Sequence, residues 1–453
     1  MVYSDKRRLS CKKIYGKNGV YIVGKFIGKG GNGEVYTVRT EKREIQYLKD
    51  VSLVVKFLTV QSYSKKESQK RRIRFENEIR HVTELQDKID GIMPIYDASI
   101  FKNQDNKALL WYIMPKAEVY KPQQYSIKQK LEHMQKLGNC LNKLHKFGYA
   151  HRDIKPKNLL MWNNQVYLSD FGLIWNVEDT DQNITEINDC LGPLTIRPPE
   201  LQMVENIHGV DYRKSDVYLF AKTIWMIIRC DKFGFYGKYS RMDDSIYIDQ
   251  EKYNIVTAEP LHRLMEEATK LDHTDRIEIS KCLEYIKNQL KVVNDEIPES
   301  TLSEWKYIEK TKRINSLYYT DERVYKDKAI ISDILNSISG LGVLIFSEHG
   351  KELGRYGFTR AGLYNDDIFE VEILNPYDNY RHKSIALSIA SINLKSDMSY
   401  DIHTNRLYTD NSPFPSFNDI ILALMDSNKR VRLDAEYIIR IENPVLASKG
   451  YET

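Results

Sequence analysis

The stretch HRDIKPKNLLMWNNQVYLSDFG, residues 151–172, carries the densest set of reactive side chains in this chain. Asp153 can accept a proton from an alcohol, and Lys155 can neutralise a phosphoryl group in transit. Asn158 and Asp170 offer the hard oxygen atoms that bind Mg²⁺ together with phosphates. Phosphoryl transfer depends mainly on where charges are placed. The order and spacing of these residues therefore predict a phosphoryl-transfer site rather than incidental surface polar groups.

A glycine-rich turn lies upstream, in IGKGGNGEV, where Gly28, Gly30 and Gly33 follow the order G-x-G-x-x-G. A dinucleotide-binding fingerprint leads from a strand into a helix, whereas a second strand follows the turn here. The pattern therefore favours a flap whose backbone N–H groups lie over phosphates, where side chains would obstruct a close approach.

Lys56 stands inside the apolar strand LVVKFL. It either points to water from a strand edge or reaches phosphates under the flap. The second alternative needs a carboxylate that holds the ammonium in place. Glu78 is the candidate, because it neighbours Ile79 in the buried stripe of a helix expected over residues 67–89.

The period of the apolar residues changes along the first 290 residues. Alternation predicts strands, and 3.6-residue spacing predicts helices. Strands are expected at 21–30, 33–40, 53–58 and 108–114, helices at 67–89 and 127–148, and mostly helical structure over 211–290.

The C-terminal third reads as an α+β region. Residues 292–300 have the polarity of a linker, and the TLSE that follows has capping-box spacing and predicts a helix from Thr301 to about Leu317. Further elements are expected as a hairpin turning at His349–Gly350, strands at 369–374, 384–394 and 430–441, and a helix at 416–427. A regulatory or interaction domain is the default interpretation, and a second enzyme is the alternative.

Composition narrows the class of protein. The 453 residues are 42% hydrophobic and 29% charged with a net charge of +4, which predicts a soluble protein of two to three domains and no clear nucleic-acid binding. The five cysteines are scattered without a CxxC pair, as expected for reduced thiols. The chain shows no signal peptide and no apolar run of about 18 residues, so a cytoplasmic protein without a membrane segment is expected.

Together these motifs resemble those of the eukaryotic-type (Hanks-type) serine/threonine protein kinase family, over about residues 20–290. The resemblance implies an α+β, bilobal protein-kinase fold at 20–291, with a β-rich N-lobe and a helical C-lobe. A basic extension at 1–19 precedes it, and a linker at 292–300 and a separate α+β domain at 301–453 follow. The implied cofactors are ATP and Mg²⁺, and the implied substrates are proteins that carry serine or threonine.

The resemblance also implies roles for single residues. Lys56 would anchor ATP and pair with Glu78, Asp153 would be the catalytic base beside Lys155, and the glycines would form the nucleotide flap. The metal ligands would be Asn158 and Asp170. The adenine pocket would be lined by Val35, Val54, Leu160, the gatekeeper Met114 and the hinge that ends at Ala117.

The proline-rich stretch GPLTIRPPE, residues 192–200, stands where the family ends its activation segment. The resemblance implies that Glu200 pairs with Arg276, and that Asp216 tethers the backbone of the catalytic loop. Pro193 replaces a threonine that is usual in the family. Thr195 is near enough to supply the missing hydroxyl, and the departure affects the pocket for the residue after the phosphoacceptor.

Arg152, next to the base, implies regulation by an anion from the activation segment. Thr180 and Thr185 are the candidate phosphosites, and self-association for trans-autophosphorylation is one route to their modification. The alternative is that acidic residues of the same loop already supply the anion.

Two other classes of function compete with a protein kinase. A pseudokinase-like scaffold typically lacks one of the catalytic residues that this chain retains. A small-molecule kinase of the same fold generally lacks the proline-rich floor that ends at Glu200. The sequence therefore favours a serine/threonine protein kinase, with Lys155–Pro156 favouring serine/threonine over tyrosine.

Overall fold

A computed structural model describes the greater part of the chain and divides it into two compact units. The first unit comprises Met1–Tyr239 and Pro260–Leu290, and the second comprises Ser240–Glu259 and Lys291–Thr453. The second unit therefore takes in residues that the sequence places between two helices of the first. The described residues are 12–29, 33–41, 51–58, 65–99, 110–177, 195–201, 210–318, 323–348, 351–364, 368–375, 381–405, 430–432 and 438–449.

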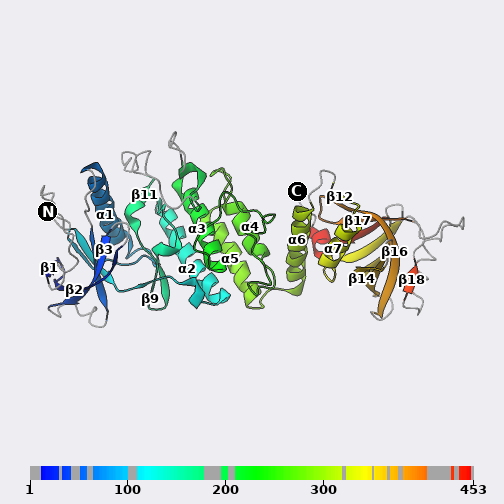
Figure 1. Ribbon diagram of the computed structural model, residues 1–453, viewed down its shortest axis with the longest axis horizontal. Coiled ribbons are helices and arrows are strands. Elements are labelled where there is room, and N and C mark those ends of the chain that lie inside the picture. Colours follow the sequence, from blue (N-terminus) through cyan, green and yellow to red (C-terminus); the bar gives the residue numbers. More distant parts are fainter. Residues whose placement is uncertain are drawn as a thin grey trace. The chain divides into compact units, whose positions relative to one another are not determined.

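The N-lobe of the first unit is an antiparallel sheet with the strand order β1-β2-β3-β4-β6-β5. Alternating β-branched and aromatic residues favour these strands, and their buried side chains form one apolar cluster. The helix α1 (Lys65–Leu85) lies beside the sheet (Figure 1). The strands are β1 (Lys13–Tyr15), β2 (Val20–Lys29), β3 (Gly33–Thr40), β4 (Leu53–Leu58), β5 (Asp97–Ser99) and β6 (Trp111–Pro115).

The helical lobe begins with α2 (Ile127–Lys146), which buries a stripe of leucines and a methionine. Ser126 and Gln129 form a capping box at its start, and Gly148 with a φ of 80° follows its end. The helices α3 (Tyr212–Arg229), α4 (Glu259–Ala268) and α5 (Ile279–Val293) complete the lobe (Figure 1). The expectation of mostly helical structure over 211–290 is wrong for residues 231–258, which form turns.

Short strands and one-turn helices lie between β6 and α3 along the chain. The hairpin β9 (Leu159–Trp162) and β10 (Gln165–Leu168) turns at Asn163–Asn164, both of which have positive φ, as this tight turn requires. β7 (Glu118–Val119) pairs with β9, and β8 (Tyr149–Ala150) pairs with β11 (Trp175–Asn176). One-turn 3₁₀ helices lie at η2 (Pro122–Gln124), η3 (Pro156–Asn158), η4 (Phe171–Leu173) and η5 (Pro199–Leu201).

The second unit is built on a closed antiparallel barrel. Its strands follow the order β16-β15-β14-β13-β19-β17, and β17 pairs again with β16, which closes the sheet. β12 (Val324–Tyr325) and β18 (Arg430–Arg432) pair with β16 from outside this ring. The barrel strands are β13 (Val343–Glu348), β14 (Lys351–Leu363), β15 (Phe369–Asn375), β16 (Arg381–Leu394), β17 (Tyr400–Asn405) and β19 (Ile438–Glu442).

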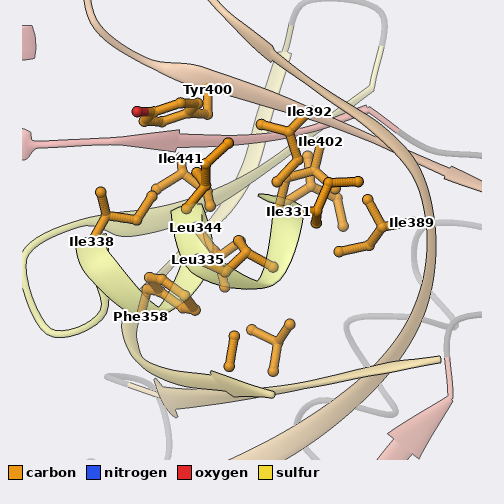
Figure 2. Packing of buried hydrophobic residues seen from close by; sticks show 14 of the residues in the cluster. Ile331, Leu335, Ile338, Leu344, Phe358, Ile389, Ile392, Tyr400, Ile402 and Ile441 are labelled. Atoms are coloured by element: carbon orange, nitrogen blue, oxygen red, sulfur yellow. The ribbon is translucent and has the colours of Figure 1, made fainter. Parts of the chain in front are cut away.

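The interior of the barrel is packed with apolar side chains. The helix α7 (Lys328–Ile338), capped by Asp327, contributes Ile331, Leu335 and Ile338 to one buried cluster with the strands. Figure 2 shows these side chains against residues from β16, β17 and β19. Because the cluster is continuous, α7 and the barrel share a single hydrophobic core.

Two expectations for the C-terminal third are wrong, and a third falls on residues outside the described ranges. The helix α6 (Glu299–Leu317) has Pro298 at its N-cap, so the predicted capping box at Thr301 is wrong. Proline suits the start of a helix because the N–H that it lacks would have no hydrogen-bond partner within the helix. The single strand expected at 430–441 is two strands, β18 and β19, with different partners. The helix expected at 416–427 lies outside the described residues.

The helix α6 holds residues 240–259 within the second unit. The Glu309 carboxylate accepts hydrogen bonds from the Thr257 hydroxyl at 2.6 Å and from the Ala258 N–H at 3.2 Å. Arg241 and Glu259 form a buried ion pair at 2.8 Å inside the same segment.

A short helix, α9 (Pro444–Lys449), follows β19. None of the helices in the described ranges is long and apolar enough to cross a bilayer.

Candidate active site

Strand β4 and helix α1 bring Lys56 and Glu78 together. The Lys56 Nζ atom lies 3.1 and 3.0 Å from the two carboxylate oxygens of Glu78. The carboxylate also accepts a hydrogen bond of 2.9 Å from the hydroxyl of Tyr112, which stands opposite Lys56 on the neighbouring strand β6. Glu78 and Tyr112 are buried. Glu78 therefore holds the ammonium, Tyr112 in turn holds the Glu78 carboxylate, and the alternative of a lysine that points to water is excluded.

Asp170 contributes to the charge balance of this pair. Burial of Lys56 disfavours its ammonium, but the negative charges of Glu78 and Asp170 outweigh that cost and raise the pKa of Lys56 well above its usual range. The lysine is therefore charged at neutral pH. A cation held in this way is available to a phosphate oxygen.

The turn between β2 and β3 is described at two of its three predicted glycines. Gly28 has open space where a Cβ would stand, as a flap that admits a ligand requires. Gly33 has a different constraint, because a Cβ there would lie 2.4 Å from the carbonyl oxygen of Phe57 on β4. Gly33 is thus required by strand packing. Gly30 lies outside the described residues.

The predicted adenine-pocket residues lie on the strands that surround Lys56. Val35 pairs with Lys56 across β3 and β4, and Val54 pairs with Met114 across β4 and β6. Leu160 lies on β9, opposite Val119 of β7. Ala117 lies between β6 and β7, in the connection between the lobes.

The loop at residues 153–158 is held by hydrogen bonds among three of the predicted site residues. The Lys155 ammonium lies 2.7 Å from both carboxylate oxygens of Asp153. The Asn158 side-chain amide donates to the Asp153 carbonyl at 2.7 Å and to its carboxylate at 2.9 Å. The carboxylate is therefore fixed in one orientation, as a general base requires.

The backbone of this loop is anchored to helix α3. The Asp216 carboxylate accepts the N–H groups of His151 and Arg152, each at 2.7 Å, and its oxygen lies 3.0 Å from the His145 imidazole. Asp216 is fully buried. Arg152 has a φ of 63°, and this unfavourable backbone conformation is stabilised by the bond to Asp216.

Asp170 lies at the end of the β9–β10 hairpin, in the left-handed conformation with a φ of 67°. The next residue, Phe171, is fully buried with its ring 4.7 Å from the imidazole of His151. The Asp170 carboxylate lies near enough to Lys56 and Glu78 for its charge to act on both.

Asn158 and Asp170 are the residues that fit a Mg²⁺ ion. Both carry oxygen atoms, the ligands that this ion prefers, and Mg²⁺ sites in phosphoryl transfer take one or two protein ligands and complete the shell with phosphates and water. Among the described residues, no group of three or more histidines, cysteines and carboxylates is arranged to hold a metal ion without such help.

The surroundings of Arg152 are described in part. Its Nε donates to the carbonyl of Leu173 at 2.7 Å, and its guanidinium carbon lies 4.9 Å from the centre of the Tyr212 ring. Burial is the main cause that lowers the pKa of Arg152, and the positive charge of Arg74 on α1 acts in the same direction. An anion would relieve both effects. Thr180 and Thr185, the candidate phosphosites, lie outside the described residues.

Glu200 and Arg276 form a buried, two-pronged ion pair. The two guanidinium nitrogens lie 2.6 and 2.8 Å from the two carboxylate oxygens, and the Ser215 hydroxyl donates to the same carboxylate at 2.6 Å. Residues 195–201 are therefore anchored to α3 and to the turn before α5. The Thr195 hydroxyl makes no hydrogen bond with Asp153 or Lys155 in the described part of the chain.

Sequence reasoning missed two side chains that support the site. The Tyr112 hydroxyl could not be assigned, because its reach to Glu78 depends on the pairing of β4 with β6. The Ser215 hydroxyl stands next to Asp216 at the start of α3, and its proximity to Glu200 depends on the fold between them.

A sequence model of the protein kinase domain matches residues 21–287, more than half of the chain. This match and the geometry described above agree, and the chain belongs to the protein kinase family. The bilobal fold is that of the family, and membership implies ATP as a substrate.

Individual relatives are distant. The dual specificity protein kinase Ttk of Danio rerio is 24% identical over 232 residues, which cover 50% of this chain and 22% of that protein. Aurora kinase of Schizosaccharomyces pombe is 28% identical over 188 residues, 40% of this chain and 48% of that protein. Serine/threonine-protein kinase PknH of Mycobacterium tuberculosis is 27% identical over 212 residues, 45% of this chain and 30% of that protein. The chain thus spans less than half the length of each of these relatives.

Proposed function

We propose that this chain transfers the γ-phosphoryl group of ATP to serine and threonine hydroxyls of proteins. The observation that carries the proposal is the joint arrangement of two charge systems. Lys56 is fixed by Glu78 with Asp170 nearby, and Asp153 is fixed by Lys155 and Asn158. Every residue of both charge systems is present, whereas a pseudokinase scaffold typically lacks at least one of them.

The residues divide the work of the reaction. Lys56 binds phosphate oxygens and keeps the nucleotide in register, and Gly28 leaves room for the flap to cover it. Asp153 accepts the proton of the attacking hydroxyl, while Lys155 moves its charge from Asp153 towards the transferred group. Asn158 and Asp170 would hold Mg²⁺, which supplies charge neutralisation at the phosphates.

Serine/threonine specificity is supported by Lys155–Pro156, in which the lysine stands two residues after the base. The anchored floor at residues 195–201 supports a protein substrate rather than a small molecule. The relatives carry both kinds of name, a dual specificity kinase and a serine/threonine-protein kinase. Identification of the phosphorylated amino acid decides between the two.

Autophosphorylation of Thr180 or Thr185 is the regulation that the site supports. Arg152 is buried near the positive charge of Arg74, so a phosphate on the activation segment would be bound by charge-assisted hydrogen bonds. Phosphorylation of one copy of the chain by another would require the chain to self-associate.

The second unit is proposed as a regulatory or recruitment module. Its interior is filled by apolar side chains, so recognition falls to its surface. Its residues 240–259, held by Glu309, stand in the sequence between residue 239 of the first unit and α4. The test is the rate of phosphoryl transfer by full-length Glu309→Gln: an altered rate supports regulation, and a rate equal to wild type contradicts it.

The experiment for the central proposal is incubation with labelled ATP and Mg²⁺, with and without Asp153→Asn. Label on the chain itself and on an added protein such as casein, lost in the variant, supports the proposal. Complete absence of turnover favours a binding scaffold, and label that enters only small molecules favours a small-molecule kinase.

A further inference from the structure

Helix α3 carries a lysine at a position that is fully buried. Lys222 lies between Ala221 and Thr223 in a part of α3 where every side chain is buried. A buried ammonium is costly unless its donors are satisfied. Burial alone would lower the pKa of Lys222 to about 6, but hydrogen bonds to carbonyl oxygens favour the charged ammonium. A lysine in such a place therefore needs a structural reason.

The donors of Lys222 are directed at backbone carbonyl oxygens. Its Nζ atom donates to the carbonyl oxygen of Phe235. It also lies 2.7 Å from the carbonyl oxygen of Gly237 and 3.4 Å from that of Thr195. The ammonium also lies 3.4 Å from the centre of the Phe235 ring, a favourable cation–π arrangement. One side chain thus serves several acceptors.

These carbonyls belong to two segments that are far apart in sequence. Thr195 begins the described part of the floor that ends at Glu200, whereas Phe235 and Gly237 belong to the loop after α3. The two segments are in direct contact, because a Cβ at Gly234 would lie 2.3 Å from the Ile196 side chain and 3.1 Å from the Thr195 oxygen. Lys222 lies beneath this contact and joins both segments to α3.

We propose that Lys222 is a positioning residue that fixes the floor at residues 195–197, against which the substrate residue after the phosphoacceptor lies. The proposal rests on the proposed function as a protein kinase. Glu200 and Arg276 anchor one end of the floor, and Lys222 anchors the other end at Thr195. The loop that Lys222 holds also presents the exposed rings of Phe233 and Tyr236 beside the floor, so its position shapes the surface that meets a peptide.

Lys222 makes no contact with the catalytic residues in the described part of the chain. Its neighbour Thr223 donates to the Ile154 carbonyl of the catalytic loop at 3.3 Å, so the two side chains serve different segments. Loss of the Lys222 ammonium is therefore expected to weaken peptide binding and alter selectivity at one substrate position. It is not expected to change ATP binding or the chemical step.

The test compares full-length wild type with Lys222→Met, using a serine/threonine-centred peptide library in which one position at a time is fixed. We expect the peptide KM of Lys222→Met to rise roughly tenfold, the factor for one lost charge-assisted hydrogen bond. Selectivity should change at the position after the phosphoacceptor, with the KM for ATP and the kcat within about twofold of wild type.

Two further variants complete the design. Lys130→Met removes another buried lysine, whose Nζ contacts the Ile228 carbonyl at 3.3 Å and the Cys230 sulfur at 3.1 Å, and it should keep the wild-type peptide KM. Gly234→Ala places a methyl group against Ile196 and should reproduce the peptide-specific effect of Lys222→Met. It decides the question if Lys222→Met does not fold.

The inference is overturned by an unchanged peptide KM and selectivity in the folded variant, or by equal changes in the KM for peptide and for ATP. Failure of wild type to phosphorylate any peptide would instead contradict the proposed function itself. The two failures are therefore distinguishable.

Discussion

Glu200→Ala removes the carboxylate that holds the buried guanidinium of Arg276. The Arg276 side chain is 0% exposed and that of Glu200 is 7% exposed, so solvent cannot replace the lost partner. Breaking a buried pair by removing one member costs about 3–5 kcal/mol, because the other charge stays buried. For a domain of this size each kcal/mol corresponds to about 2–4 °C in Tm, so a fall of about 6–20 °C is expected.

The assay is thermal and urea unfolding of full-length wild type, Glu200→Ala, Arg276→Met and the double variant. The double variant leaves no unpaired charge and should be more stable than the sum of the single changes predicts. A free energy of unfolding of Glu200→Ala within about 1 kcal/mol of wild type would contradict the expectation. So would a double variant whose loss of stability equals the sum of the losses in Glu200→Ala and Arg276→Met.

The pH dependence of the same pair has a defined sign. Burial alone would raise the pKa of Glu200, but the hydrogen bonds and charge of Arg276 outweigh burial and lower it. The stabilisation is therefore fully present above about pH 4.3, the ordinary glutamate value, and is lost as the pH falls through the depressed pKa. The difference in stability between wild type and Glu200→Gln should narrow in acid.

Three further outcomes are expected. Tyr112→Phe removes one hydrogen bond to Glu78 and should lower the free energy of unfolding by about 1–2 kcal/mol and raise the KM for ATP, with an unchanged KM for peptide; equal KM values for ATP would contradict this. The double variant Thr180→Ala/Thr185→Ala should be less active than wild type in steady-state assays, and equal activity would eliminate both phosphosites. Asp216→Asn replaces an acceptor of two backbone N–H groups and should cost about 1.5–3 kcal/mol with a lower kcat; wild-type urea unfolding would refute the tether.

The parts of the site that were predictable from sequence are those whose residues lie in short motifs. Asp153, Lys155 and Asn158 are close in sequence, so their spacing nearly determines their geometry. The Lys56–Glu78 contact was predictable because Glu78 neighbours a residue of the buried helix stripe. The motif residues were predictable from local spacing, whereas the Lys56–Glu78 contact was one of two alternatives that the sequence left open for Lys56.

The remaining features depend on long-range packing. Closure of the barrel requires β16 to pair with β17 as well as β15, which alternation within one strand does not indicate. Lys222 reads from sequence as a polar residue in a helix, and its burial follows from how residues 231–239 fold over it. The helix α7 had a readable signal in Asp327 followed by Ile331, Ile334 and Ile338, and it was missed.

Phosphoamino-acid analysis of the labelled chain and of casein, after incubation with labelled ATP and Mg²⁺, is the direct test of the proposed activity. Wild type should yield phosphoserine and phosphothreonine, and Asp153→Asn should yield neither. Phosphotyrosine as the main product would contradict the proposed specificity. Undiminished labelling by Asp153→Asn would contradict the role of Asp153 as the base, and with it the mechanism built on this site.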